Sequence, residues 1–285
     1  MKTPKRIEPL VEDGLVDTVI RQLMSGKEAM VYVVRCGEDI RCAKVYKEAN
    51  KRGFRQAANY TEGRKMKSSR RARAMEKGTR YGRKAQEDAW QSAEVDALYR
   101  LAAAGVCVPK PYHFHAGVLL MELVTDAQGE AAPRLNELVL TAEQAREYHG
   151  ILIMQVVRML CAGLIHGDLS EYNVLVGTHG PVIIDLPQAI YAADNNSAFS
   201  MLERDINNLT HYFGRFAPEL LTTDYAMEIW SHYEDGKLQP ETELTGRYAR
   251  SEKPADVDGV MREIDAAIKE AEEERQRYLQ RMEQQ

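Results

Sequence analysis

The sequence contains no apolar run long enough to cross a bilayer. Its most apolar stretch, Ile151 to Leu164, is interrupted by Gln155 and Arg158, whereas a spanning helix needs roughly 20 predominantly apolar residues. The opening Met1 to Pro9 is polar and holds two prolines, unlike the charged-then-apolar leader of a secreted protein. We therefore expect a protein that does not span a membrane and carries no secretory leader.

Cysteine is scarce and shows no pairing pattern. The four cysteines, Cys36, Cys42, Cys107 and Cys161, include no Cys-x-x-Cys pair, so the sequence indicates neither a zinc site nor a disulfide framework. A reduced, cytoplasmic location is therefore expected. The 285 residues are 44% hydrophobic and 28% charged, which suits one large domain or two small ones with buried cores.

The chain has little net charge, −5, but its charges are segregated. Lys47 to Lys84 holds fourteen Lys or Arg and three Glu, a net +11, so the remainder sums to −16. This density suits sequence-independent attraction to RNA phosphates; an acidic protein partner and simple solvation are the alternatives. Tyr60 and Tyr81 offer little aromatic interleaving, which weakens the RNA interpretation.

The stretch from Ile165 to Leu186 places Asp168, Asn173 and Asp185 at relative positions 0, +5 and +17. Two short apolar runs, residues 173–176 and 182–184, flank a Gly-Thr-His-Gly turn, which predicts a small hairpin. The hairpin would return Asp185 beside Asn173 and leave Asp168 on the loop before it.

Two carboxylates and an amide oxygen would then converge, and such hard oxygen ligands suit Mg²⁺ carrying nucleotide phosphates. The protein-kinase signature has the same order: a catalytic-loop Asp, an Asn, and a metal-binding Asp after a turn. A polar loop between two buried strands is the alternative, because a motif match is a hypothesis.

The first fifty residues predict a lead-in helix and a hairpin. Leu10 to Leu23 has apolar residues at helical spacing, which favours a short amphipathic helix. The loop that starts at Ser25 precedes a β-hairpin over residues 30–46. This loop is neither Gly-x-Gly-x-x-Gly nor a Walker A sequence, so its phosphate signal is weak. It gains weight from Lys44 in Cys-Ala-Lys-Val, a variant of the Val-Ala-Ile-Lys motif, although most strand lysines only face solvent.

A kinase-like site needs a carboxylate to hold Lys44, and Glu94 is the candidate. It lies in a helical run, Trp90 to Leu101, whose apolar residues would form a buried face. Lys44 and Glu94 are separated by more residues than a strand-to-helix connection requires. The excess is the basic segment, which we interpret as an insertion of functional or disordered character.

Val118 to Val124 is an apolar strand that would lead into the hinge between two lobes. Backbone groups near Glu122 and Val124 would contact the adenine edge, with Met121 at the back of the pocket. A buried sheet strand is the plain alternative.

The helix before the motif begins with a capping box at Thr141 and ends at Gly163. His166 is expected to be a packed, hydrogen-bonded residue rather than a base. Asp168 would mainly orient an acceptor hydroxyl, because phosphoryl transfer depends on positioning and charge neutralisation. Asp205, on a later helix, could support the loop from beneath, although a surface acid is the commoner explanation.

The sequence after Asp185 has no Ala-Pro-Glu motif and too few residues for a long activation loop with its substrate platform. Pro187 also stiffens the step after the metal-binding Asp. A last helix is expected from the N-cap Asp256 onward.

Together these segments resemble the RIO family of atypical protein kinases, most closely its first subfamily in a bacterial-type form, over about Leu10 to Arg250. The resemblance is carried by Ser25-Gly-Lys-Glu-Ala29, Val31-Tyr32, Lys44, Glu94, Met121-Glu-Leu-Val124, His166-Gly-Asp-Leu-Ser-Glu-Tyr-Asn173 and Ile184-Asp-Leu-Pro-Gln-Ala189. It implies ATP-dependent serine/threonine phosphorylation with Mg²⁺ or Mn²⁺. Relatives act in small-subunit ribosome maturation, which would suit an RNA or ribosome contact of the basic segment.

The resemblance also implies roles for single residues. Ser25 and Lys27 would lie in the nucleotide loop and Lys44 would contact phosphates. Asp168 would be the acceptor, and Asn173 and Asp185 the metal ligands. It further implies that Asp185 could itself accept phosphate, with the protein working as an ATPase switch.

Two other functions stay open. Small-molecule phosphotransferases of the aminoglycoside or choline kinase type share the His-Gly-Asp-Leu and Asn pattern, but typically have His-Pro-Gly before the Asn and Asp-Trp after the metal strand. An ATP-gated RNA- or ribosome-binding module is the second, and it would use the basic segment.

The expected fold class is α+β, a bilobal kinase-like fold with a small antiparallel-sheet N-lobe and a mainly helical C-lobe. The expected division is a helical lead-in (1–24), an N-lobe (25–120) with the basic insertion at about 47–84, hinge and C-lobe (121–250), and a C-terminal helix (251–285).

Overall fold

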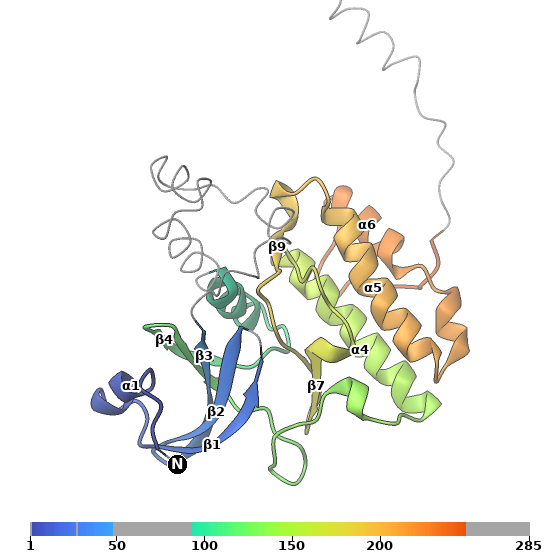
Figure 1. Ribbon diagram of the computed structural model, residues 1–285. Helices are drawn as coiled ribbons and strands as arrows, with labels where there is room; N and C mark the ends of the chain where they lie inside the picture. Colours follow the sequence, from blue (N-terminus) through green and yellow to red (C-terminus); the bar gives the residue numbers. More distant parts are fainter. Residues whose placement is uncertain (1, 27, 48–92, 249–285) are drawn as a thin grey trace, which may run out of the picture. The chain divides into compact units, whose positions relative to one another are not determined.

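The computed structural model describes residues 2–26, 28–47 and 93–248. Its amino-terminal lobe is a five-stranded antiparallel sheet with the order β1-β2-β3-β5-β4 (Figure 1). The strands are β1 (Thr18–Ser25), β2 (Ala29–Cys36), β3 (Asp39–Tyr46), β4 (Pro111–His115) and β5 (Val118–Glu122).

The predicted hairpin is formed by β2 and β3. Its two ends meet as the pair Cys36 and Asp39, and Gly37 adopts the left-handed φ of 65° that such a tight turn requires. The Gly37 N–H also donates to Asp17 Oδ2 at 2.6 Å. The glycine-containing turn that predicts the hairpin therefore also determines which residues of β2 and β3 pair.

The helix expected over Leu10 to Leu23 is wrong for most of its length. A short helix, α1 (Glu8–Glu12), is followed by Gly14 at φ 70° and then by strand β1. β1 is an edge strand with two register irregularities against β2, so its apolar residues do not alternate with period two. The exposed Ile20 and Leu23 produced the misleading helical spacing.

The chain before β1 covers one face of the sheet. Ile7, Leu10 and Val16 are fully buried or nearly so and pack against a satellite cluster on that face that includes Val34 and Val45. Because side chains alternate along β3, Lys44 points to the opposite face, toward the second lobe.

A helix lies between β3 and β4 in the sequence, and its described residues are 93–103. Ala97, Leu98 and Leu101 are buried in the main core, as the apolar pattern predicts. Glu94, one turn earlier, is also buried. The expected start of this helix at Trp90 lies outside the described residues.

The carboxy-terminal lobe is mainly helical. Its helices are α4 (Ala142–Cys161), α5 (Ala198–Gly214) and α6 (Tyr225–Glu234), with the short 3-10 helices η2 (Leu135–Glu137), η3 (Glu171–Asn173), η4 (Ala192–Asp194) and η5 (Pro218–Thr222). Two small antiparallel pairs accompany them: β6 (Leu164–Ile165) with β9 (Ile190–Tyr191), and β7 (Val174–Gly177) with β8 (Gly180–Ile183).

The capping box at the start of α4 is confirmed. The Gln144 N–H donates to Thr141 Oγ1 at 3.1 Å, and the Thr141 N–H donates to Gln144 Oε1 at 3.0 Å. The chain leaves the helix through Gly163 at φ 79°, and α4 ends at Cys161, four residues before Ile165. Local signals thus place the motif at the carboxy-terminal end of a long buried helix.

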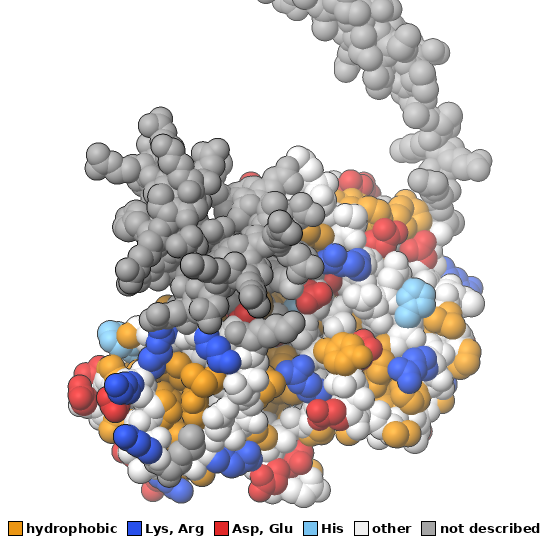
Figure 2. All heavy atoms as spheres, in the orientation of Figure 1, with side chains coloured by type: hydrophobic (Ala, Val, Ile, Leu, Met, Phe, Trp, Pro, Cys, Tyr) orange, Lys and Arg blue, Asp and Glu red, His pale blue; other side chains and the backbone are white. Residues whose placement is uncertain are grey.

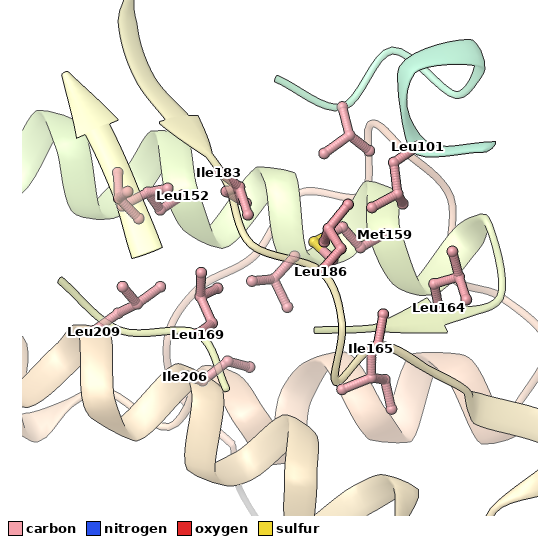
Figure 3. Packing of buried hydrophobic residues seen from close by; sticks show 14 of the residues in the cluster. Leu101, Leu152, Met159, Leu164, Ile165, Leu169, Ile183, Leu186, Ile206 and Leu209 are labelled. Carbon is pink, nitrogen blue, oxygen red and sulfur yellow. The ribbon is translucent and has the colours of Figure 1, made fainter. Parts of the chain in front are cut away.

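The core of this lobe lies between α4, α5 and the motif segment. Met159 of α4 and Ile206 of α5 contribute to it, together with Leu169 and Leu186 from the motif itself (Figure 3). The apolar residues of the motif therefore anchor the polar ones that neighbour them. Between Leu186 and α5 the chain holds only β9 and η4, in agreement with the expected absence of a substrate platform.

Acidic and basic side chains are interspersed over the described surface shown in Figure 2. The segregated charge lies elsewhere in the sequence: apart from Lys47, the basic insertion is outside the described residues, as are Lys27 and the expected helix from Asp256. Among the described helices, none is long and apolar enough to span a membrane.

Candidate active site

Lys44 links the two lobes through two carboxylates. Its Nζ donates to Glu94 Oε1 at 2.5 Å and to Asp185 Oδ1 at 3.2 Å. The side chains of Lys44 and Glu94 are 14% and 5% exposed, whereas that of Asp185 is 46% exposed. The structure therefore brings together the predicted lysine–glutamate pair and places it against the half-exposed Asp185.

The environment of Lys44 keeps its side chain charged. Burial alone would lower the pKa of Lys44, but the nearby Glu94 and Asp185 carboxylates outweigh burial and raise that pKa above its ordinary value. Burial, followed by the Glu94 charge, raises the pKa of the neighbouring Tyr46 hydroxyl. The site thus holds a permanent ammonium beside a neutral phenol.

Asp185 has an unusual backbone conformation. Its φ is 67°, in the left-handed region that non-glycine residues seldom occupy and that Asp and Asn tolerate best. The chain leaves β8 at Ile183 and turns sharply here, so that Asp185 faces Lys44 while Leu186 enters the core. Backbone strain of this kind is concentrated at functional sites in proteins.

His166 is a structural crosslink, as the sequence predicts. Its Nδ1 accepts from the Asp168 N–H at 3.3 Å, so its Nε2 carries the proton and donates to the Ile184 carbonyl at 3.0 Å. Both ring nitrogens are therefore occupied, and the ring joins the Asp168 loop to the residue before Asp185.

Asp205 supports the Asp168 loop from beneath. It is 1% exposed, so the predicted support of the loop is confirmed and the alternative of a surface acid is wrong. Its two carboxylate oxygens accept from the Gly167 N–H at 2.8 Å and the Leu169 N–H at 2.9 Å. The Asn208 side chain donates to the Leu169 carbonyl at 3.0 Å, so one face of α5 fixes the backbone on both sides of Asp168.

Asp205 makes stability depend on pH. Burial raises the pKa of Asp205 from 3.8 to about 6, against the opposing effects of His166 and the two backbone N–H groups. A raised folded-state pKa means that its stabilising contribution is complete below the unfolded-state pKa and is lost as pH rises through about 6. Urea unfolding should show the stability of wild type relative to Asp205→Asn falling by about 2 kcal/mol between pH 4.5 and 7.5. A difference that does not change with pH would contradict the shift.

Asn173 lies between the two aspartates. Its Nδ2 donates to the Asp168 carbonyl at 2.9 Å, and its own carbonyl accepts from the Ile184 N–H at 3.0 Å. The amide oxygen Oδ1 is thereby turned away from the loop backbone. Since Ile184 directly precedes Asp185, the β7–β8 hairpin returns Asp185 beside Asn173 as predicted.

The donor set fits a magnesium ion that also binds phosphate oxygens. Asn173 Oδ1 and the Asp185 carboxylate are hard oxygen donors, and Mg²⁺ is typically held by one or two carboxylates with waters and substrate phosphates. The described residues contain no cluster of three His, Cys, Asp or Glu that could hold a metal. An ion at Asn173 and Asp185 would therefore share its coordination with the nucleotide.

The predicted hinge residues Glu122 and Val124 differ in whether their backbone N–H groups are already hydrogen-bonded. The Glu122 N–H donates to the Lys110 carbonyl at 2.8 Å, and its carboxylate accepts from the Lys110 N–H at 3.0 Å. The Val124 carbonyl accepts from the Ala132 N–H at 2.9 Å, whereas its N–H has no hydrogen bond within the described residues. Of the two, only Val124 therefore has a backbone N–H left for an acceptor outside the described residues.

The β7–β8 turn holds the hinge from the second lobe. The Thr178 N–H and hydroxyl both donate to the Thr125 carbonyl, at 2.9 and 3.1 Å. A Cβ on Gly177 would lie 2.9 Å from Val124 Cγ1 and 3.2 Å from the Thr125 carbonyl oxygen. Glycine thus permits the close approach of the hairpin to the hinge. Met121, the third predicted pocket residue, pairs with Cys42 of β3.

Lys47 contacts the predicted nucleotide loop, and sequence reasoning missed it. It was counted with the basic insertion, but its Nζ donates to the Gly26 carbonyl at 2.6 Å and to Ser25 Oγ at 3.3 Å. The Gly26 N–H in turn donates to the Ala29 carbonyl at 2.9 Å. Lys47 therefore holds the predicted nucleotide loop, and its place directly after β3 was the only available signal.

These observations define a class of protein. A lysine on the third strand of an antiparallel sheet pairs with a helix glutamate and faces an Asp-x₄-Asn loop and a second Asp after a hairpin. This is the fold and site of a protein-kinase-like phosphotransferase.

Comparison with known proteins gives the family. The family model described as RIO domain matches residues 30–226. The RIO-type serine/threonine-protein kinase Rio1 of Haloferax volcanii is 35% identical over 210 residues, 73% of this chain and 68% of the relative. The corresponding kinase of Methanocaldococcus jannaschii is 32% identical over 67% of this chain and 61% of its own length.

A fungal relative matches in the same region. The serine/threonine-protein kinase RIO1 of Chaetomium thermophilum is 30% identical over 75% of this chain, but only 42% of its own length is covered. The chain belongs to the RIO family of atypical serine/threonine-protein kinases. The expected kinase-like α+β fold is thereby confirmed, and no observation favours a small-molecule phosphotransferase.

Proposed function

We propose that this chain transfers the γ-phosphoryl group of ATP, with Mg²⁺ or Mn²⁺, to serine or threonine hydroxyls of proteins, including its own. The observation that carries the proposal is the Lys44 network, in which one ammonium joins Glu94 of the first lobe to Asp185 of the second. Its charge and partial burial suit the phosphates of a nucleotide bound between the lobes.

We assign a role to each residue of the site. Lys44 would bind phosphate oxygens and Asn173 and Asp185 would hold the cation, which neutralises phosphate charge when bound. The Val124 N–H would donate to the adenine edge. Ser25, the last residue of β1, and Lys27, which lies outside the described residues, would cover the phosphates.

Asp168 acts on the acceptor. It lies at the surface with its backbone fixed by His166 and Asn173, so its carboxylate can accept a hydrogen bond from an entering hydroxyl. The hydroxyl oxygen forms a bond to the γ-phosphorus, and the bond to the bridging oxygen breaks with its electron pair leaving on ADP. The hydroxyl proton passes to Asp168 and then to solvent.

Asp185 is a second possible phosphate acceptor. Its carboxylate is half-exposed and 3.2 Å from Lys44, and an acyl phosphate formed there would be hydrolysed to complete an ATPase cycle. This alternative concerns the same bound nucleotide and differs only in whether a hydroxyl or the Asp185 carboxylate attacks it.

The test is incubation of the full chain with γ-labelled ATP and Mg²⁺, with EDTA as control. We expect metal-dependent incorporation of label that resists hydroxylamine, because serine and threonine phosphates are stable to it while an acyl phosphate at Asp185 is cleaved. Label that is fully removed would favour the ATPase cycle. The absence of both label and ADP formation would exclude the proposed function.

The partner is proposed on separate grounds. The curated relatives are named as serine/threonine kinases, but the chain covers only part of their length, so substrate and partner remain our proposal. We propose that the basic segment at 47–84 contacts RNA or the ribosome in the cytoplasm. Binding of RNA should then fall steeply with salt and be lost when residues 64–84 are deleted.

A further inference from the structure

Gln188 makes a contact that the functions proposed above do not use. Its Nε2 donates to Asp168 Oδ2 at 3.2 Å. Among the described residues, Gln188 is the only side chain that donates to the Asp168 carboxylate. The contact therefore reaches from the segment after Asp185 to the reactive group of the neighbouring loop.

The backbone presents Gln188 to Asp168 in a defined way. Residues 186–189 form a turn closed by the Ala189 N–H, which donates to the Leu186 carbonyl at 3.1 Å. Pro187 occupies the second turn position, where its fixed φ is favoured. Leu186, Pro187, Ala189 and Ile190 are all buried, and only Gln188 of this run is partly exposed. The turn is thus anchored in the core while one polar side chain points out of it toward Asp168.

Within the described residues, the other hydrogen bonds of Asp168 are made by its main chain. Its N–H donates to His166 Nδ1, and its carbonyl accepts from Asn173 Nδ2. These bonds fix the backbone but leave the side chain free to rotate about χ1 and χ2. The Gln188 amide restrains that rotation, since it occupies Oδ2 and leaves Oδ1 for an acceptor hydroxyl.

We propose that Gln188 is a positioning residue for phosphoryl transfer, which acts by orienting the Asp168 carboxylate toward the acceptor hydroxyl. This inference rests on the proposed function. Because Gln188 is three residues after Asp185 on a short anchored turn, the orientation of Asp168 is tied to the placement of Asp185. The positions of the Asp168 and Asp185 carboxylates therefore both depend on residues 185–189.

The test separates nucleotide binding from transfer. Gln188→Met keeps the size of the side chain without the donor, and Gln188→Glu keeps its shape but replaces the donor with an acceptor carboxylate. At saturating Mg·ATP, the rate of hydroxylamine-resistant labelling should fall about tenfold in Gln188→Met, the loss expected for a hydrogen bond to a charged group. It should fall further in Gln188→Glu, because two carboxylates would then repel each other.

The ATP concentration at half-maximal rate should stay within about twofold of wild type in both variants, since no nucleotide contact is removed. Gln128→Met, at an exposed turn residue, is the matched control and should label at the wild-type rate. A circular dichroism melt confirms folding, and if Gln188→Met melts early, the isosteric Gln188→Glu decides alone.

This inference would be overturned if both Gln188 variants labelled at the wild-type rate, or if they lost rate and ATP affinity equally. In either case the proposed function still stands as long as the wild-type protein itself incorporates label. A wild-type protein that incorporates no label would instead defeat the proposed function. The two failures are therefore distinguishable in one experiment.

Discussion

Replacing Asp168 with alanine will abolish phosphoryl transfer while the protein stays folded and binds ATP. The Asp168 side chain is exposed, and its backbone bonds to His166 and Asn173 do not require the carboxylate. Loss of a positioned side chain that accepts the hydroxyl proton costs roughly 10²–10⁴-fold in rate. The decrease should appear in the rate of labelling at saturating Mg·ATP, with little change in the ATP concentration at half-maximal rate.

The matched control is Asp194→Ala, which removes an exposed aspartate from η4. It should label at the wild-type rate and melt at the wild-type temperature. Wild-type labelling by Asp168→Ala would remove Asp168 from the mechanism, and with it the role we propose for Gln188.

Replacing Lys44 with methionine will destabilise the protein as well as inactivate it. Glu94 is 5% exposed, and removal of Lys44 would leave its carboxylate buried without its cation. Breaking a buried ion pair by removing one partner typically costs about 3–5 kcal/mol. We expect a loss near the lower end of this range in urea unfolding at pH 7, since the Lys44 side chain retains some exposure, and loss of ATP-dependent labelling.

A second change separates the two effects. In the double variant Lys44→Met with Glu94→Gln, the unpaired charge is gone, so most of the stability should return. ATP affinity should not return, because the phosphates would still lack their ammonium partner. If the double variant regained ATP binding, Lys44 would be a structural residue only.

The surface pair Arg146–Glu219 provides the control for the stability measurement. Its side chains are 50% and 57% exposed at a distance of 2.7 Å, and exposed pairs of this kind contribute little to stability. Arg146→Met should therefore change the free energy of unfolding far less than Lys44→Met. Equal losses of unfolding free energy in the two variants would mean that the Lys44–Glu94 pair stabilises the fold no more than a surface pair does.

Much of the site is predictable because its signals are local. The β7–β8 hairpin follows from two apolar runs around a glycine-containing turn, and the start of α4 follows from its capping box. These features depend on residues within one or two turns of each other. They suffice to bring Asn173 beside Asp185, and the lysine motif on β3 adds the opposite wall of the site.

The remaining features are decided by contacts between distant segments. β1 was misassigned because an exposed edge strand with register irregularities shows no alternating pattern. Asp205 resembles a surface acid on its helix and becomes buried only when the Asp168 loop packs onto α5. No local pattern encodes these contacts, because Leu169 and Gly167 are 36 and 38 residues from Asp205 in the chain.

The sequence by itself therefore determined the family, through the order and spacing of Lys44, Glu94, Asp168, Asn173 and Asp185, and predicted their chemistry. Only the tertiary structure decided how these groups are held. It placed the Lys47 ammonium on the Gly26 carbonyl of the predicted nucleotide loop and the Gln188 amide against Asp168. The physical reason is that a reactive group is defined by its residue type, which can be read directly from the sequence. A supporting contact, by contrast, exists only once two distant segments of the backbone have packed together.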